Sequence, residues 1–443
     1  MDMKNCTAGF ARVDMTPFLG VALSGYYDRR EMDAVAAPLY INAIAFGQGE
    51  KTAVLLAVDT EGVHKEKGRQ LHAHVAQTLG LPAESVFISC THTHTGPIIY
   101  CNDDRDPGDP EYDAFFERRL CDAARMALED RKPVIDMRTA QGEAPGITFV
   151  RRHRMKDGHY QTWGSPKDVA ERAGEGDDSL RVVRILRQDA DEIALVNFQL
   201  HPDDVGGCAC HPDFPGVLRD LVEKERPDTQ CVFFNGAEGQ MVANDWIDPD
   251  RFFGKKSVER AEYLGEKLAG FVLPLFDAAV STCEVGLNYA RASARCRTKR
   301  ELIKADPDLL PEAERIIALH ESGRDDEILP QYELLPFVSQ AYVLRGLEKM
   351  ELDWVDVPVS AVTFCGVAFL GIAGEPFNEM GKAIRAASPF QTTCVCCLTN
   401  GGEGYYATAE AYDQGGYEPR NSRFLKGVAE TLTQTSVDLL KSM

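Results

Sequence analysis

The sequence lacks the long apolar runs that mark membrane and secreted proteins. No stretch approaches the roughly 18–20 apolar residues of a membrane span, and residues 1–15 contain no apolar segment like that of a secretory signal. We therefore expect a cytoplasmic protein without stable membrane insertion. Long blocks of like charge are also absent, but 69 acidic residues outnumber 48 basic ones, which gives a formal net charge of −21. Nucleic acid repels so negative a chain, and we expect no nucleic-acid partner.

Cysteine pairs with the spacing of a metal site are absent as well. The 13 cysteines form no disulfide framework, so we expect reduced thiols. Two groups lie close in sequence, Cys208 with Cys210, and Cys394 with Cys396 and Cys397, but neither is a CxxC pair with a matching partner. A thiolate metal cluster stays open for both groups, and burial as small hydrophobic side chains is the favoured interpretation.

Apolar runs with strand and helix periodicity alternate along the 443 residues. The run Thr52–Asp59, an amphipathic stretch over 65–79 and the run Ser85–Cys90 together predict a βαβ unit. Asp157-Gly158 predicts a hairpin turn after Ile147–Arg154. Further strands are expected at Leu180–Leu186, Ile193–Gln199, Cys231–Asn235, 357–364, 367–373 and 393–399, and helices near 112–130, 215–225, 257–277, 310–322, 331–349, 376–387 and 422–441. No repeat or linker interrupts the pattern, which predicts an α/β chain with one or two large mixed β-sheets and no clean domain boundary.

The segment Thr91–Pro97, with the sequence THTHTGP, follows directly on the strand that ends at Cys90. Sheets in α/β proteins usually place their sites at the carboxyl ends of strands. In extended backbone, residues two apart project to the same side, so His92 and His94 can address one point in space. Neutral imidazole is the commonest metal ligand, which makes the segment a candidate metal site. Two polar residues in an exposed loop are the alternative.

Three more polar residues come after predicted strands. His201 ends one strand and opens the turn HPDD, so it can converge on His92. His211 lies in HPDFPG, where Asp213 is a candidate helix N-cap, and a supporting or structural role suits it better. Glu375 follows the strand 367–373 and is a candidate ligand, although its position alone favours a helix cap near the positive end of the helix dipole.

Tyr405 and Tyr406 follow another apolar strand and the glycine-rich loop 400–404. The glycines indicate close backbone approach, but the lysine and the helix start of a phosphate-binding loop are missing. Phe149–Arg154, with the sequence FVRRHR, concentrates positive charge, and in a strand Arg151 shares a face with His153. One arginine there could hold a substrate oxygen in its planar fork, and a solvated hairpin face fits the spacing equally well.

Several segments, in this order along the chain, resemble the N-terminal catalytic domain of the neutral/alkaline non-lysosomal ceramidase family. They are AGFARVDMTP, LSGYYDRR, APLYINAIAF, THTHTGP, NFQLHP, GIAGE and the tyrosine-rich close from Leu398 to Glu418. The resemblance spans nearly the whole chain. It implies that family's fold, an α/β layered sandwich with large mixed β-sheets flanked by helices, as a single catalytic domain over residues 1–443.

The resemblance also implies a zinc hydrolase. The family's Zn²⁺ ligands fall on two histidines, a glutamate and a tyrosine: His92, His201, Glu375 and Tyr405. Its general base or substrate-contacting histidine falls on His94, its substrate-binding arginine on Arg151, and a tyrosine near the reacting carbonyl on Tyr417. Two imidazoles, a carboxylate and a phenolate leave room for water or substrate, as catalytic zinc requires.

The chain departs from the family in three places. Val150-Arg151-Arg152 stands where the family has Asn-Arg-Ser, and PFNEMGKAIR follows Glu375 in place of a run of threonines. After Glu418 the chain stops within 25 residues, so we expect no C-terminal immunoglobulin-like domain. These departures put the family's substrate in question more than its chemistry.

We therefore expect a metal-dependent amidohydrolase that acts on linear amides. Its substrate would be a soluble small N-acyl compound rather than membrane ceramide, which leaves a role in sphingolipid metabolism open. Ester or phosphoester hydrolysis at the same metal is one alternative, because the basic segment around Arg151 suits a phosphate. A catalytically silent binding protein on the same scaffold is another. Assembly into a homo-oligomer is compatible with the sequence and is not decided by it.

Overall fold

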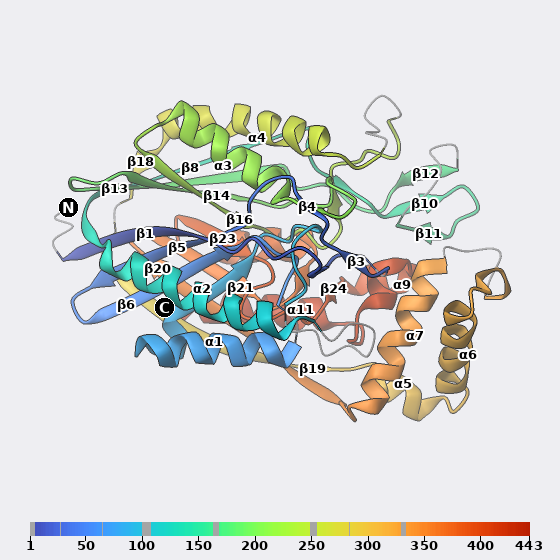
Figure 1. Ribbon diagram of the computed structural model, residues 1–443. Helices are drawn as coiled ribbons and strands as arrows, with labels where there is room; N and C mark the ends of the chain where they lie inside the picture. Colours follow the sequence, from blue (N-terminus) through green and yellow to red (C-terminus); the bar gives the residue numbers. More distant parts are fainter. Residues whose placement is uncertain are drawn as a thin grey trace.

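The structure is a computed structural model of the chain. It describes residues 5–26, 28–63, 65–99, 108–162, 168–248, 255–282, 284–328 and 334–443. Within these ranges the elements alternate between strands and helices, as the apolar periodicity predicts (Figure 1).

A nine-stranded mixed sheet forms the larger part of the fold. Its path runs through β16 (Thr229–Asn235), β14 (Glu192–Phe198), β13 (Ser179–Arg187), β8 (Lys132–Glu143), β1 (Cys6–Asp14), β5 (Tyr40–Gln48), β6 (Lys51–Val58) and β7 (Val86–Cys90), and β18 (Val280–Ser281) pairs with β8. The pairs β14–β16 and β6–β7 are parallel, and the other pairs are antiparallel. The parallel pair β6–β7 with the helix between its strands is the predicted βαβ unit.

A second sheet of four strands packs face to face against the first. It consists of β19 (Leu287–Arg297), β20 (Trp354–Phe364), β21 (Val367–Ile372) and β23 (Thr392–Cys396). One apolar core joins the two sheets, and the Phe46 ring of the first stacks on the Phe364 ring of the second with centroids 4.3 Å apart. Strands such as β5 and β21 are buried on both faces, which explains their nearly continuous apolar sequences.

Helices cover the outer faces of both sheets. α1 (Lys65–Leu79) and α2 (Pro110–Glu129) pack on one half of the large sheet, and α3 (Asp213–Glu225) and α4 (Val258–Ala278) pack on the other half. α8 (Asn378–Ala387) and α11 (Val428–Lys441) cover the four-stranded sheet. The predicted layered sandwich of large mixed sheets flanked by helices is therefore confirmed.

Three helices project from one side of the sandwich, at the right of Figure 1: α5 (Arg300–Ala305), α6 (Leu309–Glu321) and α7 (Leu334–Lys349). They connect β19 to β20 and have an apolar core of their own. α7 packs against α10 (Tyr417–Asn421), where the Arg420 guanidinium lies over the Phe337 ring at 4.4 Å and donates to Gln340 at 2.8 Å. The projection thus supports the short helix that begins at Tyr417.

Short elements complete the fold around the strand ends. They are β2 (Ala22–Leu23), β3 (Arg30–Glu31), β4 (Ala34–Val35), β9 (Phe149–Val150), β10 (His153–Met155), β11 (Tyr160–Gln161), β12 (Val169–Arg172), β15 (Ala209–Cys210), β17 (Met241–Val242), β22 (Glu375–Pro376), β24 (Tyr405–Tyr406) and α9 (Ala409–Gln414). β10 and β11 pair across Asp157-Gly158, so the predicted hairpin is confirmed.

Four long strands are missing from the sequence-based assignment: β1, β5, β8 and β19.

Two other expectations can be compared with the described residues. None of the described helices is long and apolar enough to cross a membrane. Every described cysteine is a free thiol, in agreement with the expected reduced state.

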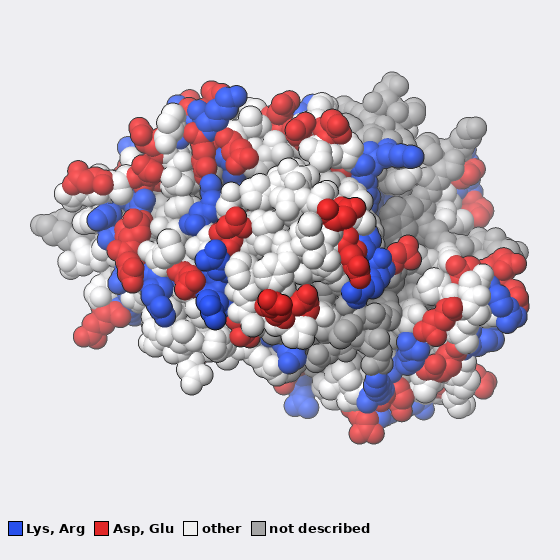
Figure 2. Space-filling view, in the orientation of Figure 1, with Lys and Arg blue, Asp and Glu red and all other residues white. Residues whose placement is uncertain are grey.

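Acidic and basic side chains are interspersed over the face shown in Figure 2. On that face the described lysines and arginines form no continuous basic surface, although white patches of uncharged residues are broad. On this face the described acidic side chains are thus scattered rather than gathered in one block.

Candidate metal centre

The carboxyl ends of strands from both sheets meet at one place. β7 and β16 lie at opposite ends of the large sheet's path, yet Asn235 at the end of β16 donates from Nδ2 to the carbonyl of Thr91 after β7, at 3.1 Å. The same amide donates to the carbonyl of Leu200 after β14, at 3.0 Å. These two carbonyls directly precede His92 and His201, so one buried asparagine holds both histidine segments together.

His92 is buried and its ring orientation is fixed from behind. Its Nδ1 donates to the carbonyl of Glu61 at 2.7 Å, which leaves the lone pair on Nε2 in the neutral ring. Nε2 lies 3.5 Å from Oε2 of Glu375. The backbone of His92 has φ 79°, a left-handed conformation that a histidine rarely adopts. Such strain, which costs about 1–3 kcal/mol, is found mainly at functional sites.

His201 is oriented in the same way by a different acceptor. Its Nδ1 donates to the carbonyl of Glu238 at 3.1 Å and lies 2.8 Å from Oε2 of the same residue, a fully buried carboxylate, so Nε2 again faces the other ligand candidates. Nε2 lies 3.4 Å from Oε2 of Glu375. Burial alone would lower the pKa of His201, but the Glu238 carboxylate more than offsets it and raises the pKa to about 9. A metal ion at Nε2 would therefore have to displace a proton.

Glu375 and Tyr405 are neighbours across the small parallel pair of β22 and β24, in direct register. The Glu375 carboxylate is buried, which by itself raises its pKa, but His92 and His201 bring the pKa below its usual value. Burial and the Glu375 charge raise the pKa of Tyr405, which opposes ionisation of its phenol. Arg151 counteracts this, because its Nη2 donates to the Tyr405 hydroxyl at 3.1 Å.

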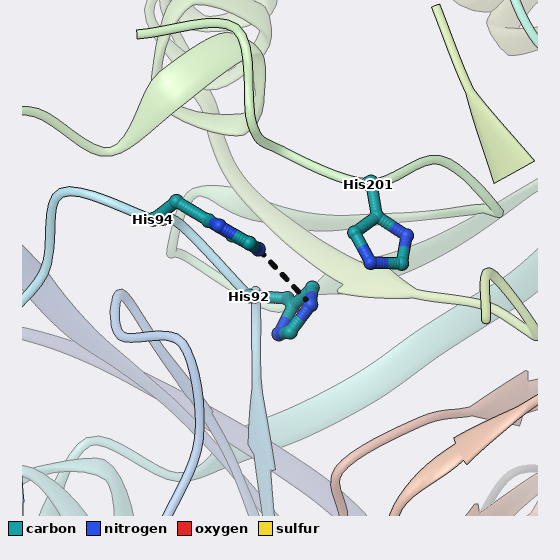
Figure 3. A group of neighbouring side chains, drawn as sticks. All are labelled: His92, His94 and His201. Atoms are coloured by element: carbon teal, nitrogen blue, oxygen red, sulfur yellow. Dashed lines mark hydrogen bonds between the residues drawn. The ribbon is translucent and has the colours of Figure 1, made fainter. Parts of the chain in front are cut away.

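His94 is the third imidazole of the group, and Figure 3 shows the three rings turned toward one another. Its Nε2 lies 3.4 Å from Nε2 of His92, and its Nδ1 lies 3.4 Å from Oδ1 of Asp203. Burial lowers the pKa of His94 to about 3, although Asp203 opposes the shift. The ring is therefore neutral, and to act as a general base it would need a neighbouring negative charge to restore its basicity, because proton transfer is most efficient with a pKa near the working pH.

Arg151 and Tyr417 border the same group. The Arg151 guanidinium is buried, its Nε donates to Oε1 of Glu418 at 2.8 Å, and its Nη1 lies 3.4 Å from Nε2 of His201. The rings of Tyr405 and Tyr417 contact edge to face at 5.6 Å, and Arg151 lies within 6 Å of both ring centres. Asn421 donates to the Tyr417 hydroxyl at 2.9 Å.

The donor atoms have the spacing of metal ligands rather than of hydrogen bonds. Ligand atoms about 2.0–2.1 Å from a tetrahedral zinc ion lie about 3.3–3.4 Å apart, whereas N–H···O bonds are about 2.9 Å long. The two Nε2–Oε2 distances to Glu375 are 3.5 and 3.4 Å. Oε2 finds no hydrogen-bond partner among the described residues, although it is buried. His92, His201 and Glu375, with Glu238 behind, therefore fit a divalent cation.

The sequence matches no family model and no curated protein. Solved structures match in fold. Neutral ceramidase from Pseudomonas aeruginosa aligns with a TM-score of 0.71 and 14% identity, over 99% of this chain and 75% of that chain. A ceramidase complexed with C2 aligns with a TM-score of 0.71 and 13% identity, over 99% of this chain and 76% of that one. This is a ceramidase-like fold.

At such low identity the likeness shows the fold, and in that respect it confirms the family resemblance seen in the sequence. The ceramidase-like fold brings together the residues predicted from that resemblance: His92, His94, Arg151, His201, Glu375, Tyr405 and Tyr417. The assignment of four of them as zinc ligands stays a prediction, because a second group of ligand type, His92 with His94 and His201, overlaps the first.

Other predicted candidates lie outside the group. His211 accepts at Nδ1 from the backbone of Asp213 at 2.9 Å, and its carbonyl accepts from the hydroxyls of Thr93 and Thr95, so it braces the THTHT segment. Asp213 was expected to cap α3. It instead has φ 57° and accepts from the backbone of residues 204 and 205 as well as from Phe214.

The three arginines of the basic segment Phe149–Arg154 also have different surroundings. The Arg152 guanidinium donates to the carbonyl of Gly415 at 2.7 Å and to Gln414 at 3.0 Å, and Arg154 pairs with Glu171 at 3.2 Å near the surface. Arg151 alone of these three faces the histidines. No cysteine joins a metal-type group within the described ranges, so Cys208, Cys210, Cys394, Cys396 and Cys397 supply no thiolate cluster there.

Sequence reasoning missed three buried supports of the group. Glu238 follows the strand Thr229–Asn235, so the strand-end rule that selected His201 could have found it. Glu418 holds Arg151 and Thr162, and only its place beside Tyr417 pointed to it. Asp59 forms a fully buried bidentate pair with Arg219 at 2.7 Å under the THTHT segment, and no local pattern announced that pair.

Proposed function

We propose that this chain is a zinc-dependent hydrolase that cleaves the amide bond of a small N-acyl compound. The observation that carries the proposal is the approach of two imidazole nitrogens, from His92 and His201, to one unpartnered carboxylate oxygen of Glu375 at 3.5 and 3.4 Å. Both rings have their other nitrogen committed to an acceptor, which directs the two lone pairs to the same point.

His92, His201 and Glu375, with Tyr405 as a fourth ligand, would hold the ion. Zinc bound by three or four such ligands lowers the pKa of a coordinated water to roughly 7 and polarises a carbonyl group. The donor set suits zinc, because imidazole and carboxylate without thiolate is common at catalytic sites that keep a position open.

The remaining side chains have separate tasks. The neutral His94 ring would take a proton from the attacking water and deliver it to the leaving amine nitrogen. Arg151 would stabilise the negative charge that develops on the carbonyl oxygen, because its Nη1 faces the group while Glu418 fixes its orientation. Tyr417, whose ring packs edge to face against that of Tyr405, would contact the same oxygen.

Amide cleavage is favoured over phosphoester cleavage by the distribution of arginines. A phosphate would be recognised best by several guanidinium groups, whereas Arg152 and Arg154 bond elsewhere. The neighbours in fold are ceramidases, which by name hydrolyse an amide, and this agrees with the proposal. Ester hydrolysis needs the same groups and is separated from amide hydrolysis only by substrate profiling.

The test begins with the metal. Metal analysis of the purified protein should return close to one zinc per chain, and the double variant His92→Ala, His201→Ala should lose it. His74→Ala, on the exposed side of α1, is the matched control and should retain the metal. Protein that purifies without metal and does not take up zinc would contradict the proposal.

Substrate profiling follows on the zinc-loaded protein. A panel of N-acyl amines, the corresponding esters, phosphoesters and a ceramide in detergent should give turnover on at least one soluble amide. His94→Ala should keep its zinc and lose that turnover. Zinc binding without turnover on any member of the panel would favour the catalytically silent binding protein, and turnover confined to phosphoesters would favour the second hydrolytic alternative. Sedimentation of the same protein would test the homo-oligomer, and fractionation of cells would test the expected cytoplasmic location.

A further inference from the structure

The His94 ring connects the candidate metal group to a second carboxylate. Its Nε2 lies 3.4 Å from Nε2 of His92, and its Nδ1, on the other side of the ring, lies 3.4 Å from Oδ1 of Asp203. Within the described part of the chain Nδ1 is buried and has no hydrogen-bond partner of ordinary length. The Asp203 carboxylate is thus the charged group beside that nitrogen, at more than the length of an ordinary hydrogen bond.

The carboxylate of Asp203 is itself held in place. The Tyr26 hydroxyl donates to Oδ1 at 2.6 Å, and Nζ of Lys256 donates to the same oxygen at 2.5 Å. These donors come from segments more than 50 residues away in either direction, so the carboxylate is clamped by tertiary contacts. One of the two donors is the Lys256 ammonium, and a carboxylate oxygen that accepts from an ammonium and a hydroxyl is favoured in its ionised form.

The backbone of His94 is tied to the Asp203 turn and to its surroundings. The His94 amide donates to the carbonyl of Pro202 at 3.1 Å, and its own carbonyl accepts from Arg30 at 2.7 Å. Gly25, at φ 99°, lies against the ring so closely that a Cβ there would be 2.6 Å from the ring carbon Cγ. The Tyr26 ring meets the His94 ring edge-on at 5.7 Å. The ring thus has little freedom to turn away from Asp203.

Two short sequence motifs produce this arrangement. In THTH, the residues His92 and His94 are two positions apart, and in HPDD the residues His201 and Asp203 have the same separation. His92 and His201 belong to the group of candidate metal ligands. Their partners two positions on, His94 and Asp203, lie next to one another.

We propose that Asp203 is the positioning residue of His94. It holds the imidazole in the tautomer with the proton on Nδ1 and the lone pair on Nε2, and it stabilises the imidazolium that forms when Nε2 takes a proton. The role rests on the proposed function, and it assigns to the HPDD turn a carboxylate that acts through His94 rather than on the substrate.

The proton balance of the step is closed. The oxygen of water attacks the carbonyl carbon, and its proton moves to Nε2 of His94. The carbon–nitrogen bond then breaks, and the same proton passes from Nε2 to the leaving amine nitrogen. Asp203 keeps its charge throughout, and no oxidant or further reactant is needed. Contacts of this kind are often long in the resting protein and shorten in the reacting complex, which accounts for 3.4 Å.

The test is a double-mutant cycle on turnover. With N-acetyl to N-octanoyl 4-nitroanilides as the probes, Asp203→Ala should lower kcat on the order of 10²-fold, and Asp203→Asn, which keeps an acceptor without charge, on the order of tenfold, while KM changes little. On the residual turnover that the zinc site retains in His94→Ala, Asp203→Ala should have no further effect, because both changes remove one unit. Additive losses, or a loss confined to KM, would overturn the proposal.

A matched control separates positioning from general damage. Asp220→Asn makes the same change on the exposed side of α3 and should leave kcat, zinc content and unfolding temperature at the wild-type values. Asp203→Asn should likewise keep its zinc and its unfolding temperature. A variant that loses zinc in proportion to kcat would point to a role in the metal group instead and would contradict the assignment.

A measurement without substrate decides the contact even if no nitroanilide is cleaved. In the proton NMR spectrum of the zinc-loaded protein, buried imidazole N–H protons resonate far downfield. One such resonance should vanish in His94→Ala and shift upfield in Asp203→Asn, and Asp220→Asn should leave it in place. If no resonance depends on His94, or if Asp203→Asn leaves it unshifted, the pairing is wrong. Absent turnover with the expected spectrum would refute the proposed function and retain the Asp203–His94 pair.

Discussion

Replacement of Glu238 by glutamine is the change that best tests how the metal group is tuned. Oε2 of Glu238 lies 2.8 Å from Nδ1 of His201, and both side chains are almost completely buried. Glutamine has the same shape and can still accept from Nδ1–H, but it has no charge. The variant therefore removes the charge that makes the His201 ring more basic, and leaves the packing in place.

Glutamine loses the charge of the contact with Nδ1 but keeps an acceptor. A hydrogen bond to a charged partner contributes about 1.5–3 kcal/mol and one between neutral groups about 0.5–1.5 kcal/mol, so the difference is about 1–1.5 kcal/mol. At about 1.4 kcal/mol for each factor of ten, this corresponds to a loss of roughly 5–10-fold in zinc affinity. Loss of a carboxylate behind a ligating histidine typically weakens metal binding by about 10–100-fold.

The assay is competition for zinc between the protein and a chelating dye at a fixed pH above 9, where no proton competes with the ion for Nε2 of His201. Glu192→Gln is the matched control, because Glu192 pairs with Arg184 at the far end of β14, the strand that leads to His201. An unchanged dissociation constant in Glu238→Gln would refute the claim that this carboxylate tunes His201. A loss beyond about 1,000-fold would refute it as well, because only removal of a ligand itself explains so large an effect.

Three further predictions concern the surroundings of the group. Arg151→Lys should lower kcat/KM at least about tenfold in steady-state assays, because a point charge cannot bond at once to Glu418, a carbonyl and a phenol. Asp59→Asn should lower the unfolding free energy, measured with denaturant, by about 3–5 kcal/mol, because it leaves Arg219 buried without its counter-charge. Burial lowers the pKa of His72 to about 4, so its contribution to stability is present above pH 6.5 and is lost as the pH falls through 4, at up to about 1.4 kcal/mol per pH unit. The acid-induced loss of stability should therefore be smaller in His72→Gln than in the wild type.

The layered fold could be predicted from apolar periodicity wherever a strand or helix buries its own residues. The four missed strands show two different limits. β8 and β19 are partly exposed, and arginine, glutamine and other polar residues occur along much of their length. Their sequences therefore lack the apolar run that indicates a buried strand. They form strands because β13 and β20 offer full-length pairing partners. β5, in contrast, is buried over seven consecutive positions, of which only Asn42 is polar, and its composition alone supported a strand.

His92 and His94 lie close together, as predicted, but the reason predicted for it is wrong. Extended backbone was expected to point His92 and His94 to the same side, but His92 has φ 79° and leaves the extended region. The two Nε2 atoms meet because Thr91 and His92 donate to the carbonyls of Val58 and Thr60 in the segment after β6, which redirects the chain. A two-residue spacing therefore identifies candidates, and the neighbouring segment decides where the rings point.

The position of a polar residue directly after a strand marks it as a site candidate, but does not tell a metal ligand from a supporting residue. Thr91–His94, His201, Glu238 and Glu375 all follow strands, and nothing in their spacing separates a ligand from its support. The separation comes from acceptors elsewhere in the chain. The carbonyl of Glu61 accepts from Nδ1 of His92, and the carbonyl of Glu238 accepts from Nδ1 of His201, with the Glu238 carboxylate 2.8 Å from the same nitrogen. Each contact commits one nitrogen and frees the other for a cation, so the identity of the ligand set depends on which groups stand behind the rings.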